Sequence, residues 1–291
     1  MKRKGIILAG GSGSRLFPLT TVTSKQLLPI YDKPLIYYSL STLMESMIKD
    51  ILIISSSDYI DSYFKLLGDG SKFGINISYA PQEKPDGIAQ SFLIGEKFLM
   101  NANCCLILGD NIFYGNELSE TFYKANQNNN ATIFAYHVSD PERYGIVSFK
   151  KNKQIISIEE KPKKPKSNYA VTGIYFYDST VVEYAKTLKP SSRGELEITD
   201  LNNLYLSDGK LDIEIFDRGI SWIDTGTHQS LLEASQFVST IERRQGLKIG
   251  CPEEIAYKNN WISSDDIVNI ASNYPGDYSK YLMRLVESKW N

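Results

Sequence analysis

Residues 5–30, which read GIILAGGSGSRLFPLTTVTSKQLLPI, decide the fold of this chain. The first five of them form a short apolar run without polar alternation, which is typical of a strand buried on both faces of a parallel sheet. Residues 10–13, Gly-Gly-Ser-Gly, tolerate positive φ and carry little side chain, so their backbone N–H groups can approach an anion closely. Arg15 and Lys25 add positive charge nearby. The stretch therefore predicts an α/β fold whose first strand ends in a loop suited to a triphosphate.

Two common glycine-rich motifs do not fit this loop. The dinucleotide-binding fingerprint G-x-G-x-x-G lacks its third glycine, because Leu16 stands at that position. The Walker motif fails because no Gly-Lys-Ser/Thr closes the loop. A glycine-rich turn that binds nothing stays possible on the glycines alone, but Arg15 and Lys25 favour an anion site.

Composition and charge limit the possible partners. The 291 residues can bury one large α/β core, with or without a smaller appendage. A formal net charge of −2 provides no overall positive field for binding nucleic acid or a membrane surface. The apolar segment after the basic start is too short for a signal peptide or a membrane span. Three cysteines, at 104, 105 and 251, form no metal-binding spacing, and an odd count is typical of a reducing compartment. We expect a cytoplasmic protein.

Strands and helices alternate along the chain. Residues 39–48 carry apolar side chains at helical spacing, and residues 50–55 form a second buried strand, so a right-handed parallel crossover is expected. Further strands are predicted at 75–79, 104–108, 131–137, 155–161, 169–177, 213–216 and 220–223, with a helix at 61–67 and another opening within 193–200. This order predicts a Rossmann-like, mainly parallel sheet flanked by helices.

Polar residues follow two of these strands, at the edge where open α/β sheets bind ligands. The amide of Gln82 opens a loop and could pair with a pyrimidine base, although a Pro-Gly turn capping a helix is an equal alternative. Asp110 follows the strand at 104–108. One carboxylate there could hold the Mg²⁺ of a nucleotide, and an Asx turn is the competing interpretation.

Glu160 and Lys161 are a second informative pair. A carboxylate can accept hydrogen bonds from sugar hydroxyls, and an adjacent ammonium can meet a sugar phosphate, so the pair fits a hexose 1-phosphate. Gly145 would let backbone approach the sugar ring. Taken alone, the two charges could equally belong to a solvated surface.

The opening stretch resembles the signature of the sugar nucleotidyltransferases, G-G-x-G-[ST]-R-L-x-P-L-T followed by S-K-Q-L-L-P. It stands here at 10–20 and 24–29, with Ser14 where many relatives have threonine. The elements L-G-D-N at 108–111 and E-E-K-P at 159–162, followed by N-Y-A-V-T-G-I-Y at 168–175, resemble the family too. The resemblance runs over essentially the whole chain, with the motifs in the order of the family.

The resemblance implies roles for individual residues. Nucleotide-binding residues would be Leu8, Gly10, Gly11, Gly13, Ser14, Arg15, Lys25, Gln26, Gln82, Pro85, Gly87 and Asp110. Sugar-binding residues would be Asn111, Tyr144, Gly145, Glu160, Lys161 and Val171, in a smaller sugar-binding part of the fold. Metal ligands would be Asp110 and Asp224, and the catalytic set would be Arg15, Lys25, Asp110 and Lys161.

The reaction implied by this resemblance joins dTTP and α-D-glucose 1-phosphate into dTDP-glucose and pyrophosphate, with Mg²⁺, as the first step of dTDP-deoxysugar biosynthesis such as that of rhamnose. No nucleophile of the enzyme is required. One alternative is the same chemistry with UTP or another sugar 1-phosphate. Another is a non-catalytic nucleotide-sensing subunit, whose mark would be the loss of Arg15, Lys25 or an aspartate, and none of these is lost.

The C-terminal part is predicted to be helical. Leu231, Ala234, Val238 and Ile241 recur at three- and four-residue steps, and more helix is expected through Trp290. We divide the chain into a nucleotidyltransferase domain at 1–241 and a helical segment at 242–291. This tail resembles that of tetrameric family members, dimers of dimers in which a second nucleotide site at a subunit interface inhibits the enzyme. The corresponding residues are Tyr114, Gly115, Arg218, Lys248, Cys251, Glu254 and Lys258. A helical cap that only closes the core is the competing interpretation.

Overall fold

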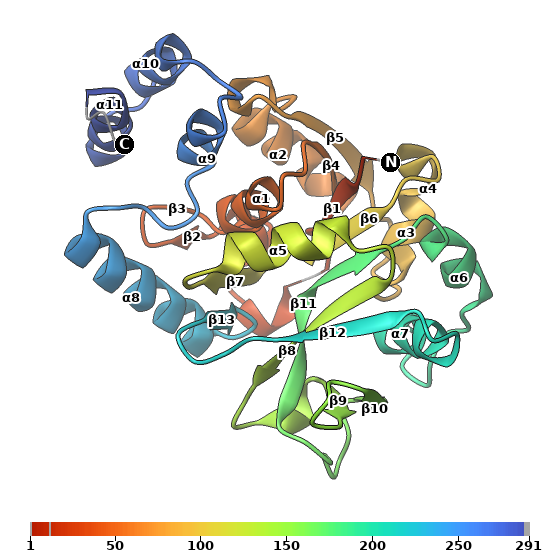
Figure 1. Cartoon of the computed structure of the whole chain (residues 1–291). Coiled ribbons are helices and arrows are strands. Elements are labelled where there is room, and N and C mark those ends of the chain that lie inside the picture. The colour runs from red at the N-terminus through yellow and green to blue at the C-terminus, as the bar shows by residue number, and fades with distance from the viewer. Residues whose placement is uncertain (1, 12, 288–291) are drawn as a thin grey trace.

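The structure, a computed structural model, describes residues 2–11 and 13–287. Ser12 of the predicted phosphate loop and residues 288–290 of the predicted C-terminal helix lie outside these ranges. The described chain folds around one central sheet with helices packed on both of its faces (Figure 1). The predicted α/β fold is confirmed.

The central sheet contains the predicted buried strands. Its members are β1 (Lys4–Leu8), β4 (Asp50–Ser55), β5 (Asn76–Pro81), β6 (Cys104–Leu108), β8 (Ala131–His137), β9 (Gly145–Phe149), β10 (Ile155–Glu160), β11 (Tyr169–Tyr177) and β12 (Leu211–Ile215). The four neighbours β6, β1, β4 and β5 are parallel, as the predicted crossovers require. Next to them, β11 runs antiparallel to β6, β8 and β9. The sheet is therefore parallel from β6 to β5 and mixed beyond β6.

Helices cover both faces of the central sheet. One face packs against α1 (Ile36–Glu45), α2 (Ile60–Leu67), α5 (Leu118–Gln127) and α9 (Pro252–Lys258). The other packs against α3 (Gln90–Ile94), α4 (Glu96–Leu99), α6 (Val181–Thr187) and α7 (Ile198–Ser207). Within the described residues, no helix combines the length and the apolar character needed to cross a membrane.

Two short ribbons stand apart from the central sheet. One pairs β2 (Pro29–Ile30) with β3 (Lys33–Pro34), directly after the stretch that carries Lys25. The other pairs β7 (Asn111–Tyr114) with β13 (Ser221–Asp224) in antiparallel register. The second ribbon joins segments that are far apart in the sequence.

The C-terminal part is helical, as predicted. Helix α8 (His228–Gln245) begins with a capping box between Thr227 and Ser230 and ends at Gly246, whose φ is 72°. Ala234 and Val238 bury the predicted apolar face of α8. Helices α10 (Ser264–Ser272) and α11 (Asp277–Glu287) follow α9 and share a small core of their own. The predicted boundary after residue 241 falls inside α8, and the division into two parts stays a prediction.

Buried charges tie the β2–β3 ribbon to α8. The Lys33 ammonium lies 2.6 Å from an Asp32 oxygen and 2.9 Å from a Glu242 oxygen. Lys248 pairs with the same two carboxylates and lies 3.0 Å from Glu242. The Ile249 N–H also donates to Glu242, at 2.9 Å. The side chains of Lys33 and Glu242 are only 2% and 5% exposed, so this cluster is an internal cross-link.

Candidate active site

A cavity of about 440 Å³ lies beside the end of β6 and the β7–β13 ribbon. Every residue predicted to bind sugar lines it, together with Arg15, Asp110 and Asp224 from the predicted phosphate and metal sites. The remaining lining residues are Ile88, Leu108, Arg143, Gly173, Tyr175, Ile198, Thr199, Asn202 and Trp222. The fold thus gathers predicted residues from widely separated parts of the chain around one space.

The two predicted metal ligands come together through the β7–β13 ribbon. In its register Asn111, which follows Asp110, stands opposite Asp224. The next residue, Thr225, donates from its backbone N–H and from its hydroxyl to the Asp110 carbonyl oxygen, at 3.2 and 2.9 Å. The ribbon therefore places both aspartates at the same cavity.

Electrostatics differ sharply between the two aspartates. The buried Lys25 ammonium donates to Asp110 Oδ2 at 2.5 Å. Burial works to raise the pKa of Asp110, but the charge and hydrogen bond of Lys25 and the hydrogen bond of Asn111 outweigh it, so this pKa lies below its ordinary value. Burial, and then the negative charge of Asp110, raise the pKa of Asp224, while Lys25, Arg15 and Arg143 oppose the rise. The site therefore holds one carboxyl group with a lowered pKa, Asp110, and a second with a raised pKa, Asp224.

The glycine-rich loop adopts the conformation that its composition predicts. Gly11 and Gly13 have φ values of 100° and 59°, in the region that side chains disfavour. Thr20 folds back and donates from its hydroxyl to the Gly13 carbonyl at 2.8 Å. A short 3₁₀ turn, Ser14–Leu16, follows and carries Arg15 to the cavity.

The other predicted nucleotide-binding residues do not line this cavity. They are Leu8, Gly10, Gly11, Gly13, Ser14, Lys25, Gln26, Gln82, Pro85 and Gly87. Several of these side chains already have protein partners: Lys25 bonds Asp110, and the buried Gln26 accepts from the Ser24 hydroxyl at 2.9 Å. The nucleotide contacts of this set stay predictions.

Gln82 and Gly10 lie against each other. The buried Gln82 amide donates to Gln90 Oε1 at 2.7 Å. A Cβ added at position 10 would lie 1.9 Å from Gln82 Oε1, so glycine is what lets this amide sit over the end of β1. The predicted base-binding amide is therefore held beside the predicted phosphate loop.

Gly87 has a different reason to be glycine. Its φ is 105°, and a Cβ there would lie 2.4 Å from the Leu196 carbonyl oxygen. The Leu196 N–H donates to the Asp86 carbonyl at 2.7 Å, and the Ala89 N–H donates to the Leu196 carbonyl at 3.2 Å. This bonding keeps residues 193–196 out of helix, so α7 begins at Ile198, in the second half of the stretch 193–200 that was predicted to open it.

These two glycines give a matched pair of alanine variants. We expect Gly87→Ala to destabilise the fold by about 1–3 kcal/mol, because Cβ would meet fixed backbone at a positive φ. Gly10→Ala should change stability much less, since only the movable end of the Gln82 side chain must shift. Thermal unfolding of both variants tests the difference. Equal losses would contradict this assignment of the two glycines.

On the sugar side of the cavity, Glu160 is the centre of a hydrogen-bonded group. Its Oε2 accepts from the Thr199 hydroxyl at 2.5 Å, and its Oε1 accepts from Arg193 at 3.3 Å. Lys161 has a φ of 42°, unusual for a residue other than glycine, and its ammonium lies 3.7 Å from Glu160. Such backbone strain is frequent at functional sites.

Sequence reasoning did not assign roles to several residues at this cavity. Arg143 lies 3.7 Å from Asp224, and Trp222 donates from its indole N–H to Asn111 Oδ1 at 2.5 Å. Arg193, in the stretch predicted to open a helix, donates to Glu160 at 3.3 Å. Arg143 directly precedes Tyr144, and Trp222 stands two positions before Asp224, so nearness to predicted residues was a usable signal.

Asn111 has more protein partners than its predicted sugar contact implies. Its Nδ2 donates to Asp110 Oδ1 at 2.8 Å, and its Oδ1 also accepts from the Gly173 N–H at 3.2 Å. With the indole of Trp222, these bonds occupy both ends of a buried amide. The sugar contact of Asn111 stays a prediction.

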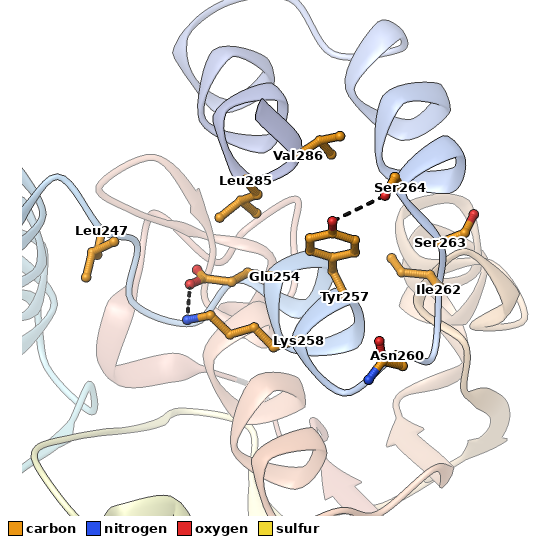
Figure 2. A pocket seen from close by; sticks show the side chains of 10 residues that line it. All are labelled: Leu247, Glu254, Tyr257, Lys258, Asn260, Ile262, Ser263, Ser264, Leu285 and Val286. Atoms are coloured by element: carbon orange, nitrogen blue, oxygen red, sulfur yellow. Dashed lines mark hydrogen bonds and ion pairs between the residues drawn. The ribbon is translucent and has the colours of Figure 1, made fainter. Parts of the chain in front are cut away.

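The predicted effector residues are distributed over three cavities. Tyr114, Lys248, Cys251, Glu254 and Lys258 line one of about 530 Å³. Gly115 lines a neighbouring cavity of about 140 Å³ together with Lys248, whereas Arg218 lines a third, beside Tyr136 and His137. A further cavity of about 580 Å³ lies between α9 and α11, where Glu254 and Lys258 pair at 2.6 Å and face Leu285 (Figure 2). The structure thus brings five of the seven residues to one space.

Comparison with known proteins gives consistent matches. A model of the nucleotidyl transferase family matches residues 4–241. A glucose-1-phosphate thymidylyltransferase of Neisseria meningitidis serogroup A is 56% identical over 286 residues, which are 98% of this chain and 99% of that protein. Proteins with the same name from Xanthomonas campestris pv. campestris and Mycobacterium tuberculosis are 54% and 50% identical, each over 98% of this chain and over 98% and 99% of their own lengths.

Two solved structures share the fold. A Bacillus anthracis protein assigned as a glucose-1-phosphate thymidylyltransferase, crystallised with sucrose, is 47% identical with a TM-score of 0.74, over 81% of this chain and 94% of that one. A UDP-glucose pyrophosphorylase with bound UDP-glucose gives a TM-score of 0.73 at 24% identity, over 83% and 100%, and supports the fold alone. The chain therefore belongs to the nucleotidyl transferase family, together with the glucose-1-phosphate thymidylyltransferases.

Proposed function

We propose that this chain transfers the thymidylyl group of dTTP to α-D-glucose 1-phosphate, which yields dTDP-glucose and pyrophosphate. The activity named for its relatives supports the substrates. The observation that carries the proposal is one cavity lined by Arg15, by Asp110 and Asp224, and by the Glu160–Lys161 pair. That cavity offers cationic groups for two phosphorylated substrates and a carboxylate for sugar hydroxyls.

The chemistry requires arrangement and no covalent intermediate. A phosphate oxygen of the sugar attacks the α-phosphorus of dTTP in line, and the bond from that phosphorus to the β-phosphate oxygen breaks. A phosphate monoester is already ionised at neutral pH, so no general base is needed. The protein contributes by orienting two anions against their repulsion and by stabilising charge in the transition state.

Each cation has a proposed task. Arg15 would hold the β- and γ-phosphates that leave, Lys25 the α-phosphate, and Lys161 the incoming phosphate. Lys25 is already fixed by Asp110, so it needs little reorganisation to meet the nucleotide. Arg143 lines the same cavity, and Arg193 donates to Glu160 of its lining. Both arginines would add to the positive field of the site.

A magnesium ion fits the two aspartates. Among residues 2–11 and 13–287, no group of three or more histidine, cysteine or acidic side chains is placed to hold a metal. Mg²⁺ prefers one or two carboxylates together with phosphate oxygens and water, so Asp110 and Asp224 provide a suitable partial set. Burial, and then the negative charge of Asp110, raise the pKa of Asp224, and a divalent cation bound there would favour its ionised form. When bound, the metal would neutralise charge on the nucleotide phosphates.

Gln82, Pro85 and Gly87 would recognise the thymine base. The Gln82 amide lies against Gly10 of the predicted phosphate loop. A nucleotide whose phosphates bind that loop would have its base close to this amide. The thymine methyl is a small apolar feature, so discrimination against UTP is expected to be incomplete.

Pyrophosphate release over a grid of nucleotides and sugar 1-phosphates tests this function. We expect the highest kcat/KM for dTTP with glucose 1-phosphate, and a lower value for UTP. A preference for a purine nucleotide would overturn the base assignment. No release with any combination would instead favour the non-catalytic, nucleotide-sensing alternative.

We further propose that the enzyme is cytoplasmic, that it supplies dTDP-deoxysugar and polysaccharide biosynthesis, and that it forms a homotetramer. The 530 Å³ cavity that holds Lys248, Glu254 and Lys258 supports a second, allosteric nucleotide site. Residues 242–291 would form this regulatory part, and residues 1–241 the catalytic domain. Gly115, from a neighbouring cavity, and Arg218, from a separate one, would complete the site.

A further inference from the structure

Thr225 joins the segments that carry the two metal-binding aspartates. It follows Asp224 directly, and its side chain is fully buried, so it cannot contact a substrate. Its hydroxyl and its N–H both donate to the carbonyl oxygen of Asp110, at 2.9 and 3.2 Å. Thr225, the residue after Asp224, is therefore hydrogen-bonded to the backbone of Asp110.

Other contacts leave Asp110 little freedom. Its Oδ2 accepts from Lys25 at 2.5 Å, and its Oδ1 accepts from Asn111 at 2.8 Å. Asn111 is in turn held by the indole N–H of Trp222, from the same strand as Asp224. A Cβ at Gly173 would lie 2.5 Å from Asn111 Oδ1, so the space around this amide is closed.

Asp110 and Asp224 line the same cavity, so their carboxylates repel each other when both are ionised and no cation lies between them. Something must hold them at a spacing that one ion can bridge. The β7–β13 register aligns the two strands, and the Thr225 hydroxyl adds a bond to the backbone carbonyl of Asp110, next to the pair. Outer-shell hydrogen bonds of this kind commonly change metal affinity by about 10- to 100-fold.

We propose that Thr225 is a positioning residue of the metal site, whose hydroxyl holds Asp110 and Asp224 at the spacing that one divalent cation requires. The inference rests on the proposed function, because it refines the same metal site. It assigns Trp222 a second, weaker positioning role through Asn111. Neither role requires contact with the nucleotide or the sugar.

The test measures Mn²⁺ binding to the full chain in the presence of saturating dTTP and without sugar phosphate. Water-proton relaxation is the readout of binding. Thr225→Val keeps the shape and the backbone N–H but removes the hydroxyl, and we expect its Mn²⁺ dissociation constant to rise by about tenfold. Thr225→Ser keeps the hydroxyl and should stay within about twofold of the unchanged protein. The KM for glucose 1-phosphate should not change in either variant.

Matched controls separate this role from general damage. Thr132→Val removes a comparably buried hydroxyl on β8, one that accepts from Asn128 at 3.1 Å, and should leave Mn²⁺ binding unchanged. If Thr225→Val fails to fold, Trp222→Phe provides a second test, because it keeps an aromatic ring but removes the indole N–H that donates to Asn111. Its Mn²⁺ dissociation constant should also rise.

The outcomes distinguish this inference from the proposed function. A folded Thr225→Val protein with unchanged Mn²⁺ affinity would overturn the positioning role, as would an equal loss in Thr225→Ser. If Asp110→Asn binds Mn²⁺ as tightly as the unchanged protein, the metal site itself is wrong.

Discussion

Replacing Asp110 with asparagine should lower kcat for pyrophosphate release by about a hundredfold or more, the usual effect of removing one electrostatic group from such a site. The substitution removes the negative charge of a carboxylate whose pKa Lys25 and Asn111 keep low despite burial. It would also unbalance Lys25, the proposed partner of the α-phosphate.

The fold should survive this change, because an asparagine oxygen can still accept from Lys25 and the Asp110 carbonyl keeps both bonds from Thr225. Steady-state pyrophosphate release together with the far-ultraviolet circular dichroism spectrum provides the measurement. Asp212→Asn, the same chemical change on an exposed residue of β12, should behave as the unchanged protein. Near-normal turnover in Asp110→Asn would refute the metal assignment.

Replacing Glu242 with alanine should give the largest loss of stability, about 3–5 kcal/mol, as expected when one partner of a buried charge cluster is removed. Glu242 accepts from both Lys33 and Lys248 and from the Ile249 N–H. Without it, Asp32 alone would balance two lysines. Lys33 is almost fully buried, so water could not take the place of the lost carboxylate.

Urea unfolding at one fixed protein concentration measures this effect, since the stability of an oligomer depends on concentration. The control is Glu214→Ala, which breaks a pair with Lys153 whose side chains are 47% and 53% exposed. That exposed pair should contribute at most about 1 kcal/mol. If both variants shift the urea midpoint equally, the β2–β3 ribbon is not held to α8 by these charges.

Much of the fold could be predicted from local patterns. The predicted bounds of β4, β6, β8 and β11 agree with the structure, because apolar and aromatic residues dominate each of these stretches. The start of α7 was predicted only to within the stretch 193–200, and the structure has it at Ile198. The bond from Leu196 to Asp86, a residue from another loop, holds the preceding residues out of helix, and no local pattern shows such a bond.

The candidate site was partly predictable as well. Glu160, Lys161 and Tyr144 were assigned by resemblance, and the structure places them around one cavity. Arg143 and Trp222 line the same cavity without having been assigned. Their side-chain types do not specify a role until the neighbouring strand brings Asp224 and Asn111 within reach.

By itself the sequence determined the alternating elements and the glycine loop with its cations, because apolar periodicity and backbone freedom are properties of neighbouring residues. That Asp110 and Asp224 line one cavity, and that the Thr225 hydroxyl donates to the Asp110 carbonyl, can be seen only in the folded chain. The reason is physical: strand pairing over long sequence separations depends on how the whole core packs, and a residue's spacing along the chain does not encode it.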